Sequence, residues 1–283
     1  MKKLLALTVA LLLTVSAVGC GSSASSSSSA PSSQAASSEA PANVVLKVGA
    51  SPAPHAEILE SVKEALAAQG ITLDITEFTD YVLPNNAVFD KSLDANYFQH
   101  QPYLTKFNEE NKTDLVSAGS IHFEPLGIYP GKTASLEALA DGAKIAVPND
   151  PTNEARALNL LAANGIITLK EGVGLNATPK DIIENPKNIK IVELEAAQVP
   201  NALADVDLGV INGNYAVPAG IIDTVLVTED PGSEAAQEFA NIVAVSPAKK
   251  DDPAVAALIK ALCSEETRKF ISEKYGAAVI PVF

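Results

Sequence analysis

The chain has 283 residues, of which 47% are hydrophobic and 5% aromatic, with 34 acidic against 20 basic side chains. The formal net charge of −14 disfavours nucleic acid and anionic lipid headgroups as partners, because phosphate contacts need clustered Lys and Arg. Residues 44–283 are enough for a sizeable core, in one large domain or in two lobes.

The first twenty residues have the pattern of a secretory signal. Lys2-Lys3 precede the uncharged apolar run Leu4–Val18, and small residues then lead into Cys20. An apolar run this short, ending in small residues, is typical of a cleaved signal rather than a membrane span. Cys20 resembles the acylated cysteine of a bacterial lipobox, although Ala17 stands where leucine is usual. We predict a signal peptide over residues 1–19 and lipidation at Cys20, with ordinary cleavage nearby as the alternative.

The segment after Cys20 is dominated by Ser, Ala and Pro and has no apolar periodicity. Such a composition buries too little surface to offset its conformational entropy, so residues 20–43 are predicted to be a lipidated, flexible tether. The folded body would then be held at the extracytoplasmic face of the bacterial cell membrane. If Cys20 is lipidated, Cys263 has no partner and no intrachain disulfide can form.

The body alternates between strand-like and helix-like segments. Val44–Gly49 and Ile71–Phe78 are strand-like and flank a helix whose apolar residues recur at helical spacing, namely Ile58, Leu59, Val62 and Leu66. Strand, helix and strand in this order make a right-handed parallel unit. The later predicted elements are strands at Lys144–Val147, Ile189–Leu194, Leu208–Ile211 and Ile242–Val245, a helix at Asn153–Ala163, and a final helix at Pro253–Tyr275 broken near Ser264. These segments predict an α/β fold with helices over mostly parallel sheets.

Ligands of open α/β sheets bind beyond the carboxyl ends of the strands, so the residues after each strand are site candidates. Asp150 or Thr152 is a suitable N-cap for the helix Asn153–Ala163, which places Arg156 near its first turn. A cation there faces the positive end of the helix dipole. Arg156 therefore either pairs with Glu154 or Asp150, or joins nearby backbone N–H groups in binding a ligand carboxylate.

A polar turn follows the strand Leu208–Ile211. Asn212 and Asn214 flank Gly213 there, a pattern typical of a tight turn. The amide oxygens could equally accept hydrogen bonds from an ammonium group. Composition leaves both interpretations open.

Aromatic residues gather in one stretch of a chain otherwise poor in rings. The stretch contains Tyr81, Tyr97, Phe98, Tyr103 and Phe107. Core packing is the default interpretation of such rings. Residues 94–103, however, mix the rings with amides and His100. We interpret this segment as a partly open wall that holds an apolar ligand group and hydrogen-bonds its edges.

Several long motifs occur in the order known from one family. They are FTDYVLPN (78–85), DANYFQHQPYL (94–104), VPNDPTN (147–153), ENPKN (184–188), INGNYA (211–216) and YGAAVIP (275–281). From about Leu46 to its end the chain resembles the methionine-binding lipoproteins of ABC importers, the NlpA/MetQ-like substrate-binding proteins. The resemblance implies a type II periplasmic-binding-protein fold with two α/β lobes joined by two crossover strands. Lobe I would comprise 44–125 plus 224–283, and lobe II 126–223.

The resemblance also implies a function. The protein would not be an enzyme but would capture L-methionine in the interlobe cleft and deliver it to an ABC importer permease with its cytoplasmic ATPase. Carried over by motif position, Arg156 would bind the carboxylate, while Asn212 and Asn241 would bind the polar groups of the amino acid. The ligand side chain would be lined by Tyr81, Phe98 and His100, with Asn153, Tyr103 and Asn214 as further candidates from the matching motifs. Gly220–Glu234 departs from the family pattern and is predicted to be a variable hinge-side loop.

Other classes of function remain as alternatives. The same fold could bind another apolar amino acid or a methionine-containing dipeptide. A metal-binding receptor is disfavoured because the three histidines, His55, His100 and His122, lack the spacing of zinc ligands. An enzyme is disfavoured because no G-x-S-x-G, P-loop or H-E-x-x-H motif occurs, and we predict no cofactor.

Overall fold

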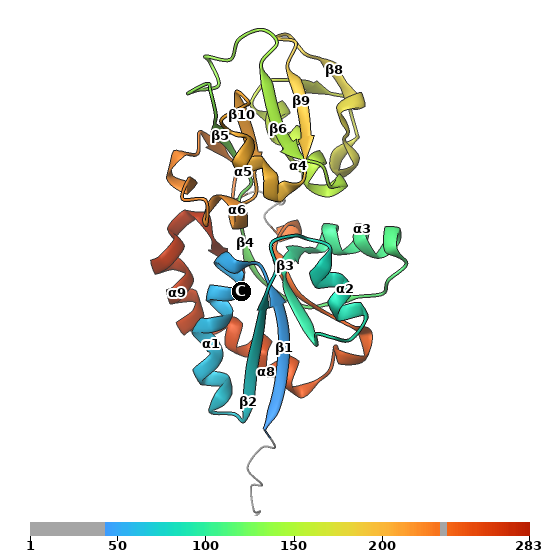
Figure 1. The fold of residues 1–283 in the computed structure, drawn as a ribbon, viewed down its shortest axis with the longest axis vertical. Helices are drawn as coiled ribbons and strands as arrows, with labels where there is room; N and C mark the ends of the chain where they lie inside the picture. The colour runs from blue at the N-terminus through green and yellow to red at the C-terminus, as the bar shows by residue number, and fades with distance from the viewer. Residues whose placement is uncertain (1–42, 233–236) are drawn as a thin grey trace, which may run out of the picture. The chain divides into compact units, whose positions relative to one another are not determined.

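The structure, a computed structural model, describes residues 43–232 and 237–283 (Figure 1). The predicted signal peptide, the lipidation site Cys20 and nearly all of the predicted tether lie outside these residues. Within the part of the chain that is described, no helix is both long and apolar enough to cross a membrane. The described residues fold around two larger sheets with helices, which confirms the predicted α/β class.

The first sheet has six strands in the order β13-β4-β12-β3-β1-β2. The strands are β1 (Val44–Ala50), β2 (Ile71–Glu77), β3 (Ala95–His100), β4 (Val116–Phe123), β12 (Asn241–Val245) and β13 (Ile280–Pro281). β1 pairs in parallel with both β2 and β3, as expected for strands separated by helical crossovers. β12 lies antiparallel between β3 and β4, although it comes more than a hundred residues later in the chain.

Helices cover both faces of this sheet (Figure 1). One group is α1 (Glu57–Ala67), α8 (Pro253–Leu262) and α9 (Glu265–Tyr275), and the other is α2 (Leu83–Phe89) and α3 (Gln101–Asn111). The apolar stripe of α1 is buried in the core together with Leu258 and Leu262 of α8. Helical periodicity therefore identified the buried face of α1 correctly.

The second sheet has five strands in the order β11-β5-β10-β6-β9. They are β5 (Gly127–Pro130), β6 (Lys144–Pro148), β9 (Lys190–Leu194), β10 (Leu208–Ile211) and β11 (Val227–Thr228). β6 pairs in parallel with β9 and β10, and α4 (Pro151–Ala163) buries its apolar side against this sheet. Smaller elements complete this part: α5 (Val199–Ala202), α6 (Gly213–Ala216), and a hairpin of β7 (Thr168–Leu169) and β8 (Ile182–Glu184).

The chain changes sheets twice, from β4 to β5 and again between β11 and β12. This arrangement is the predicted pair of α/β lobes with two connections. One boundary differs from the prediction, since residues 224–283 were assigned to lobe I but Val227 and Thr228 pair with β5 in the second sheet. Two residues are too few to show a strand periodicity in the sequence. The other lobe limits stay predictions.

Most predicted elements lie within a few residues of their predicted limits. β10 occupies the predicted Leu208–Ile211, and the final helix is broken at Ser264. The Ser264 Oγ accepts a hydrogen bond from the Thr267 N–H at 3.2 Å, which begins α9.

The segment 94–103 is less open than its interpretation as a partly open wall, although four of its residues line a cavity, namely Phe98, Gln99, His100 and Tyr103. β3 within it is buried along its whole length, and Tyr97 is fully enclosed. The polar side chains of β3 bond to other buried amides rather than to solvent: Asn96 Nδ2 and Gln99 Nε2 both donate to Asn85 Oδ1, at 2.8 and 2.6 Å. A buried amide cluster, which needs no opening to water, therefore explains most of the polarity.

Candidate ligand-binding site

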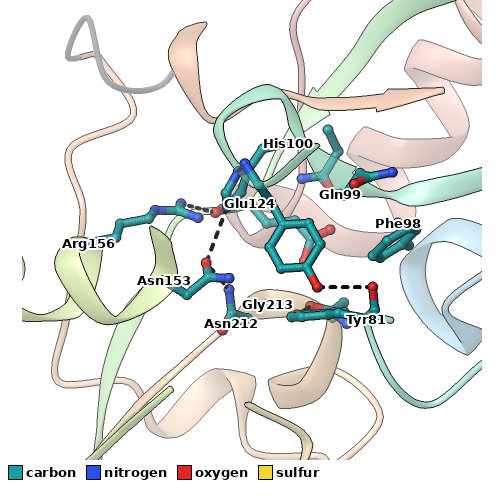
Figure 2. Close-up of a pocket in the computed structure, with 12 residues that line it drawn as sticks. Tyr81, Phe98, Gln99, His100, Glu124, Asn153, Arg156, Asn212 and Gly213 are labelled. Atoms are coloured by element: carbon teal, nitrogen blue, oxygen red, sulfur yellow. Dashed lines mark hydrogen bonds between the residues drawn. The ribbon is translucent and has the colours of Figure 1, made fainter. Parts of the chain in front are cut away.

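A small cavity lies where the two lobes meet, and Figure 2 shows the 12 residues that line it. All of the residues predicted to bind a ligand are among them: Tyr81, Phe98, His100, Tyr103, Asn153, Arg156, Asn212, Asn214 and Asn241. Gln99, Glu124 and Gly213 also line the cavity and were not predicted. The cavity volume is about 20 Å³, which is room for about one water molecule. A larger guest therefore requires the lining side chains or the lobes to move apart.

A chain of hydrogen bonds fixes the amides on the lobe II side of the cavity. Asp150 caps α4 by accepting from the Asn153 N–H at 3.0 Å, and it also accepts from the Asn153 side-chain Nδ2 at 2.9 Å. This fixes Asn153 with its Oδ1 toward Asn212, whose Nδ2 donates to that oxygen at 2.9 Å. The Asn212 Oδ1 is buried and has no hydrogen-bond partner among the described residues.

His100 connects this chain to lobe I. The Tyr103 N–H donates to His100 Nδ1 at 3.1 Å, so Nδ1 is the unprotonated nitrogen. His100 Nε2 therefore carries the proton and donates to Asn153 Oδ1 at 3.2 Å. Burial, together with the nearby Arg156, lowers the pKa of His100 to about 3 and keeps the ring neutral.

Arg156, on α4, is buried and forms an ion pair with Glu229. Its Nε and Nη2 donate to the Glu229 carboxylate at 2.6 and 2.5 Å, and Nη2 also donates to the Glu124 carbonyl oxygen at 2.9 Å. The predicted partners Glu154 and Asp150 are therefore wrong, because the fold brings a residue 73 positions away alongside the guanidinium. No hydrogen bond of Arg156 Nη1 is found among the described residues, so this nitrogen remains available to a guest.

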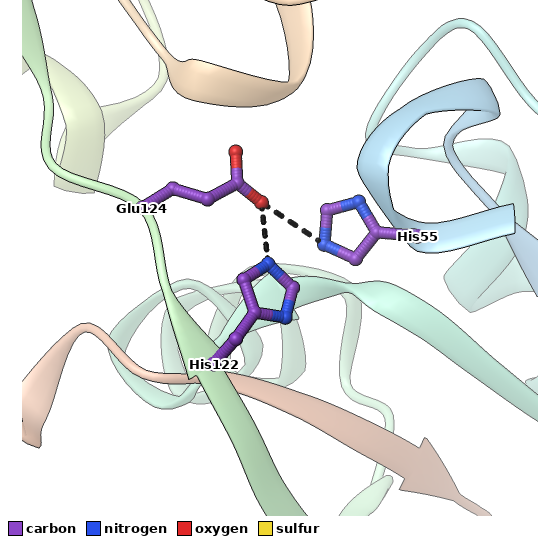
Figure 3. A group of neighbouring side chains, drawn as sticks. All are labelled: His55, His122 and Glu124. Carbon is purple, nitrogen blue, oxygen red and sulfur yellow. Dashed lines mark hydrogen bonds and ion pairs between the residues drawn. The ribbon is translucent and has the colours of Figure 1, made fainter. Parts of the chain in front are cut away.

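Glu124 is held by two buried histidines, as Figure 3 shows. Its Oε1 lies 2.7 Å from His122 Nε2 and 3.4 Å from His55 Nε2. His55 Nε2 also lies 3.0 Å from Asn241 Oδ1. Burial lowers the pKa of His55 to about 4 and that of His122 to about 3, so both rings are neutral donors near pH 7.

These three side chains also form a possible metal-ligand set, since one ligand atom from each lies within 4.8 Å of the others. Their sequence spacing gave no sign of this, because β4 and the turn Pro52–Ala56 come together only in the fold. Each of the three already has a hydrogen-bond partner in the group, which explains the cluster without an ion.

Three rings form the apolar side of the cavity. The Tyr81 ring lies 5.7 Å from both Phe98 and Tyr103, centroid to centroid, and Phe98 lies 6.0 Å from Tyr103. The Tyr81 hydroxyl donates to Asn214 Oδ1 at 2.6 Å, which links this wall to lobe II. The rings thus offer a soft apolar surface beside the polar amides.

The residues that were not predicted differ in how far the sequence could have identified them. Glu124 directly follows the apolar end of β4, so the rule that ligands bind beyond strand ends could have identified it. Gly213 was noted only as part of a turn. In the fold, a Cβ at Gly213 would meet Glu124 Oε2 at 2.6 Å, so glycine permits the close approach. Glu229 shows no local pattern.

Comparisons with known proteins identify the family of the chain. The family model described as NlpA lipoprotein matches residues 46–283. The membrane lipoprotein TpN32 of Treponema pallidum is 42% identical over 238 residues, covering 83% of this chain and 87% of the relative. The D-methionine-binding lipoprotein MetQ of Salmonella typhimurium is 39% identical over 241 residues, with 83% and 87% covered.

A solved structure gives the same result. A nutrient binding protein from Burkholderia cenocepacia, bound to methionine, superposes with a TM-score of 0.80 at 43% identity, covering 84% of this chain and 100% of the other. The family match, which extends over nearly all of the described residues, and these identities lead to one conclusion. The chain belongs to the NlpA lipoprotein family.

Proposed function

We propose that this protein is an extracytoplasmic substrate-binding protein of an ABC importer, anchored by a lipid on Cys20, that captures L-methionine in the interlobe cavity. The relatives support the class, since they include methionine-binding lipoproteins and a structure bound to methionine. The observation that carries the proposal is the cavity itself, which combines a guanidinium, the unpaired amide oxygen of Asn212 and an aromatic wall. Such a set suits a zwitterion with an apolar side chain.

The donors in the cavity suit the carboxylate of the ligand. Arg156 keeps Nη1 free of internal hydrogen bonds among the described residues, and a guanidinium is a strong carboxylate partner. Asn241 uses its Oδ1 to accept from His55, so its Nδ2 is the group left for the cavity. Arg156 and Asn241 are therefore assigned to the carboxylate.

The aromatic wall suits the thioether. Sulfur is polarizable and gains from contact with ring edges, which Tyr81, Phe98 and Tyr103 offer together with the neutral His100. Residues on both lobes would contact the ligand, so binding stabilises the closed arrangement that a permease can distinguish from an open one. In this proposal the protein delivers its ligand to the permease and its ATPase and performs no chemistry.

Calorimetry on the mature protein tests this function directly. L-methionine is expected to bind more tightly than leucine, and more tightly than D-methionine or a methionine-containing dipeptide. Native mass spectrometry after gentle purification should show the mass of methionine on the protein. Tighter binding of a dipeptide or of another amino acid would replace methionine as the ligand, and the absence of binding to all of them would exclude the function.

The helix cap at Asp150 gives a smaller prediction. Asp150→Ala is expected to lower the free energy of unfolding by about 1 kcal/mol, the usual cost of an N-cap, and to weaken L-methionine binding because Asn153 loses its orientation. Asp252→Ala is the matched control, since Asp252 caps α8 away from the cavity, accepting from the Ala254 N–H at 2.8 Å. Urea denaturation and calorimetry should show similar losses of stability but a loss of affinity only in Asp150→Ala. Equal affinities would contradict the role of the amide chain.

A further inference from the structure

The cluster of His55, His122 and Glu124 brings together side chains that bind metal ions. Both histidines are fully buried, and Glu124 is 6% exposed. His55 comes from the turn Pro52–Ala56, whereas His122 lies near the end of β4 and Glu124 directly after it. Figure 3 shows the two rings and the carboxylate turned toward one another. Two imidazoles and one carboxylate are a ligand set that zinc proteins use.

The distances within the cluster suit one small ion. Glu124 Oε1 lies 2.7 Å from His122 Nε2 and 3.4 Å from His55 Nε2, and one ligand atom of each residue lies within 4.8 Å of the others. In a tetrahedral zinc site with bonds of about 2.0–2.1 Å, neighbouring ligand atoms are about 3.3 Å apart. The observed distances lie on both sides of that value, so small shifts of the side chains bring all three atoms within bonding distance of one ion.

The protonation of the two rings permits this change. Burial lowers the pKa of both histidines, so neither ring carries a charge that would repel a cation. A metal needs Nε2 without its proton, which must then move to Nδ1 of the same ring. At His122 the moved proton meets the Tyr97 hydroxyl, which already bonds to Nδ1 and can accept as well as donate. At His55, Nδ1 has no hydrogen-bond partner among the described residues, so no existing bond opposes the move.

Tyr97 provides the outer support that metal-binding histidines use. Such histidines usually donate their second ring N–H to an oxygen, which fixes the orientation of the ring. Tyr97 is fully enclosed, and its hydroxyl contacts His122 while its ring lies edge-on to His55 with the centroids 4.7 Å apart. One buried side chain therefore holds both imidazoles in orientation.

The chemistry of the donor atoms selects the class of metal. Ca²⁺ and Mg²⁺ prefer oxygen ligands only, whereas imidazole nitrogens favour divalent transition metals such as Zn²⁺. Asn241 Oδ1 lies 3.0 Å from His55 Nε2 and adds a neutral oxygen beside the cluster. Two nitrogens, one carboxylate oxygen and this amide oxygen suit a four-coordinate Zn²⁺ ion.

We propose that His55, His122 and Glu124 form a binding site for one Zn²⁺ ion, with Tyr97 as a positioning residue outside the ligand set. The proposed capture of methionine needs no metal, so the two proposals stand or fall separately. Glu124 begins the segment that leads from β4 to β5, while both histidines belong to lobe I. The ion would therefore fix the first connection between the lobes at its lobe I end.

The test is calorimetry on the mature protein with Zn²⁺ alone, in the absence of any amino acid. The wild type should bind one equivalent. Glu124→Gln and His122→Ala should each weaken the binding by more than about 100-fold, since a lost ligand costs more than a lost outer partner. Co²⁺ in place of Zn²⁺ should give visible absorption bands that disappear in both variants. Cys263→Ser is the control for the free thiol among the described residues and should bind Zn²⁺ as the wild type does.

A milder variant keeps the test valid if the loss of a ligand impairs folding. Tyr97→Phe retains all three metal ligands and removes only the hydroxyl at His122 Nδ1, so it should weaken Zn²⁺ binding by roughly 10–100-fold. Tyr129→Phe is the matched control, because Tyr129 is also buried but belongs to β5 and to a different part of the core. It should keep the full affinity for Zn²⁺.

Thermal unfolding gives an independent readout. An ion that binds the folded protein raises the midpoint of thermal unfolding, so Zn²⁺ should raise it in the wild type but not in Glu124→Gln. Ca²⁺ at the same concentration should leave both midpoints unchanged, and an equal rise with Ca²⁺ would contradict nitrogen ligands.

Two results overturn the zinc site. The first is wild-type protein that binds no stoichiometric Zn²⁺. The second is binding that persists undiminished in Glu124→Gln, His122→Ala and Tyr97→Phe, because the ion then lies elsewhere. Neither result affects the proposed function, since no methionine is present in these measurements.

Discussion

Replacing Arg156 with alanine is expected to weaken L-methionine binding by about 2–5 kcal/mol, because the carboxylate then stays buried without its partner. Arg156 is 4% exposed, lines the cavity and keeps Nη1 free of hydrogen bonds to the other described residues. Calorimetric titration of the variant with L-methionine measures the loss. Near wild-type affinity would show that the carboxylate binds elsewhere.

The stability of this variant must be separated from its affinity. Removing Arg156 leaves the Glu229 carboxylate partly buried without a counter-ion, which is itself destabilising. The double variant Arg156→Met with Glu229→Leu removes both charges and should recover stability without recovering affinity. Arg268, the other arginine of the chain, belongs to α9, and Arg268→Ala should bind L-methionine as the wild type does.

Phe98→Ala is expected to weaken L-methionine by about 1–3 kcal/mol, while binding of L-alanine changes much less. Phe98 is 3% exposed and packs between Tyr81 and Tyr103 on the apolar side of the cavity. The side chain of methionine reaches this wall, but the methyl group of alanine does not extend as far. The ratio of the two affinities, measured by calorimetry, isolates this contact from the zwitterion contacts that the ligands share.

Phe107 provides the matched control for this prediction. It belongs to the same aromatic cluster and stacks on Tyr103 at 6.5 Å, but it does not line the cavity. Phe107→Ala should lower the free energy of unfolding and keep the preference for methionine over alanine. If Phe98→Ala weakens both ligands equally, Phe98 is core packing and the wall has been assigned to the wrong ring.

Short-range sequence patterns correctly predicted a buried helix face, a helix N-cap and a helix break. The stripe of α1, the N-cap at Asp150 and the break at Ser264 each follow from residues within one or two helical turns. Their physical causes, helical periodicity and capping of free N–H groups, act over the same short range. For the cavity, the rule that ligands bind beyond strand ends gave Arg156, Asn212 and Asn214 as candidates. The family motifs then placed them at one site with Tyr81, Phe98 and the others.

Long-range pairings could not be read from the sequence. Arg156 and Glu229 are 73 residues apart, and their contact exists only because the second connection between the lobes returns past α4. His55 and Asn241 are 186 residues apart and meet because β12 is inserted into the first sheet. Reasoning from spacing therefore offered Arg156 only neighbours on its own helix and treated the histidines as unrelated.

The polarity of β3 shows a second limit of prediction from the sequence. Alternating rings and amides suggested a partly open wall that holds an apolar ligand group, but Asn96 and Gln99 hydrogen-bond to each other and to Asn85 inside the fold. A buried amide costs little when every donor finds an acceptor. Composition shows how many polar groups a segment carries, whereas only the tertiary structure shows what they meet.

The tight enclosure of the cavity has a kinetic consequence. The cavity has a volume of about 20 Å³, and Tyr81 is bonded to Asn214 across it, so an amino acid can enter or leave only when these lining groups separate. The ligand can dissociate only after the two lobes separate. The rate of lobe opening is therefore an upper limit on the dissociation rate of tightly and weakly bound ligands alike. The residence time of the ligand in solution would then be set by how often the lobes open. Release of the ligand at the membrane would depend on a permease that opens the lobes.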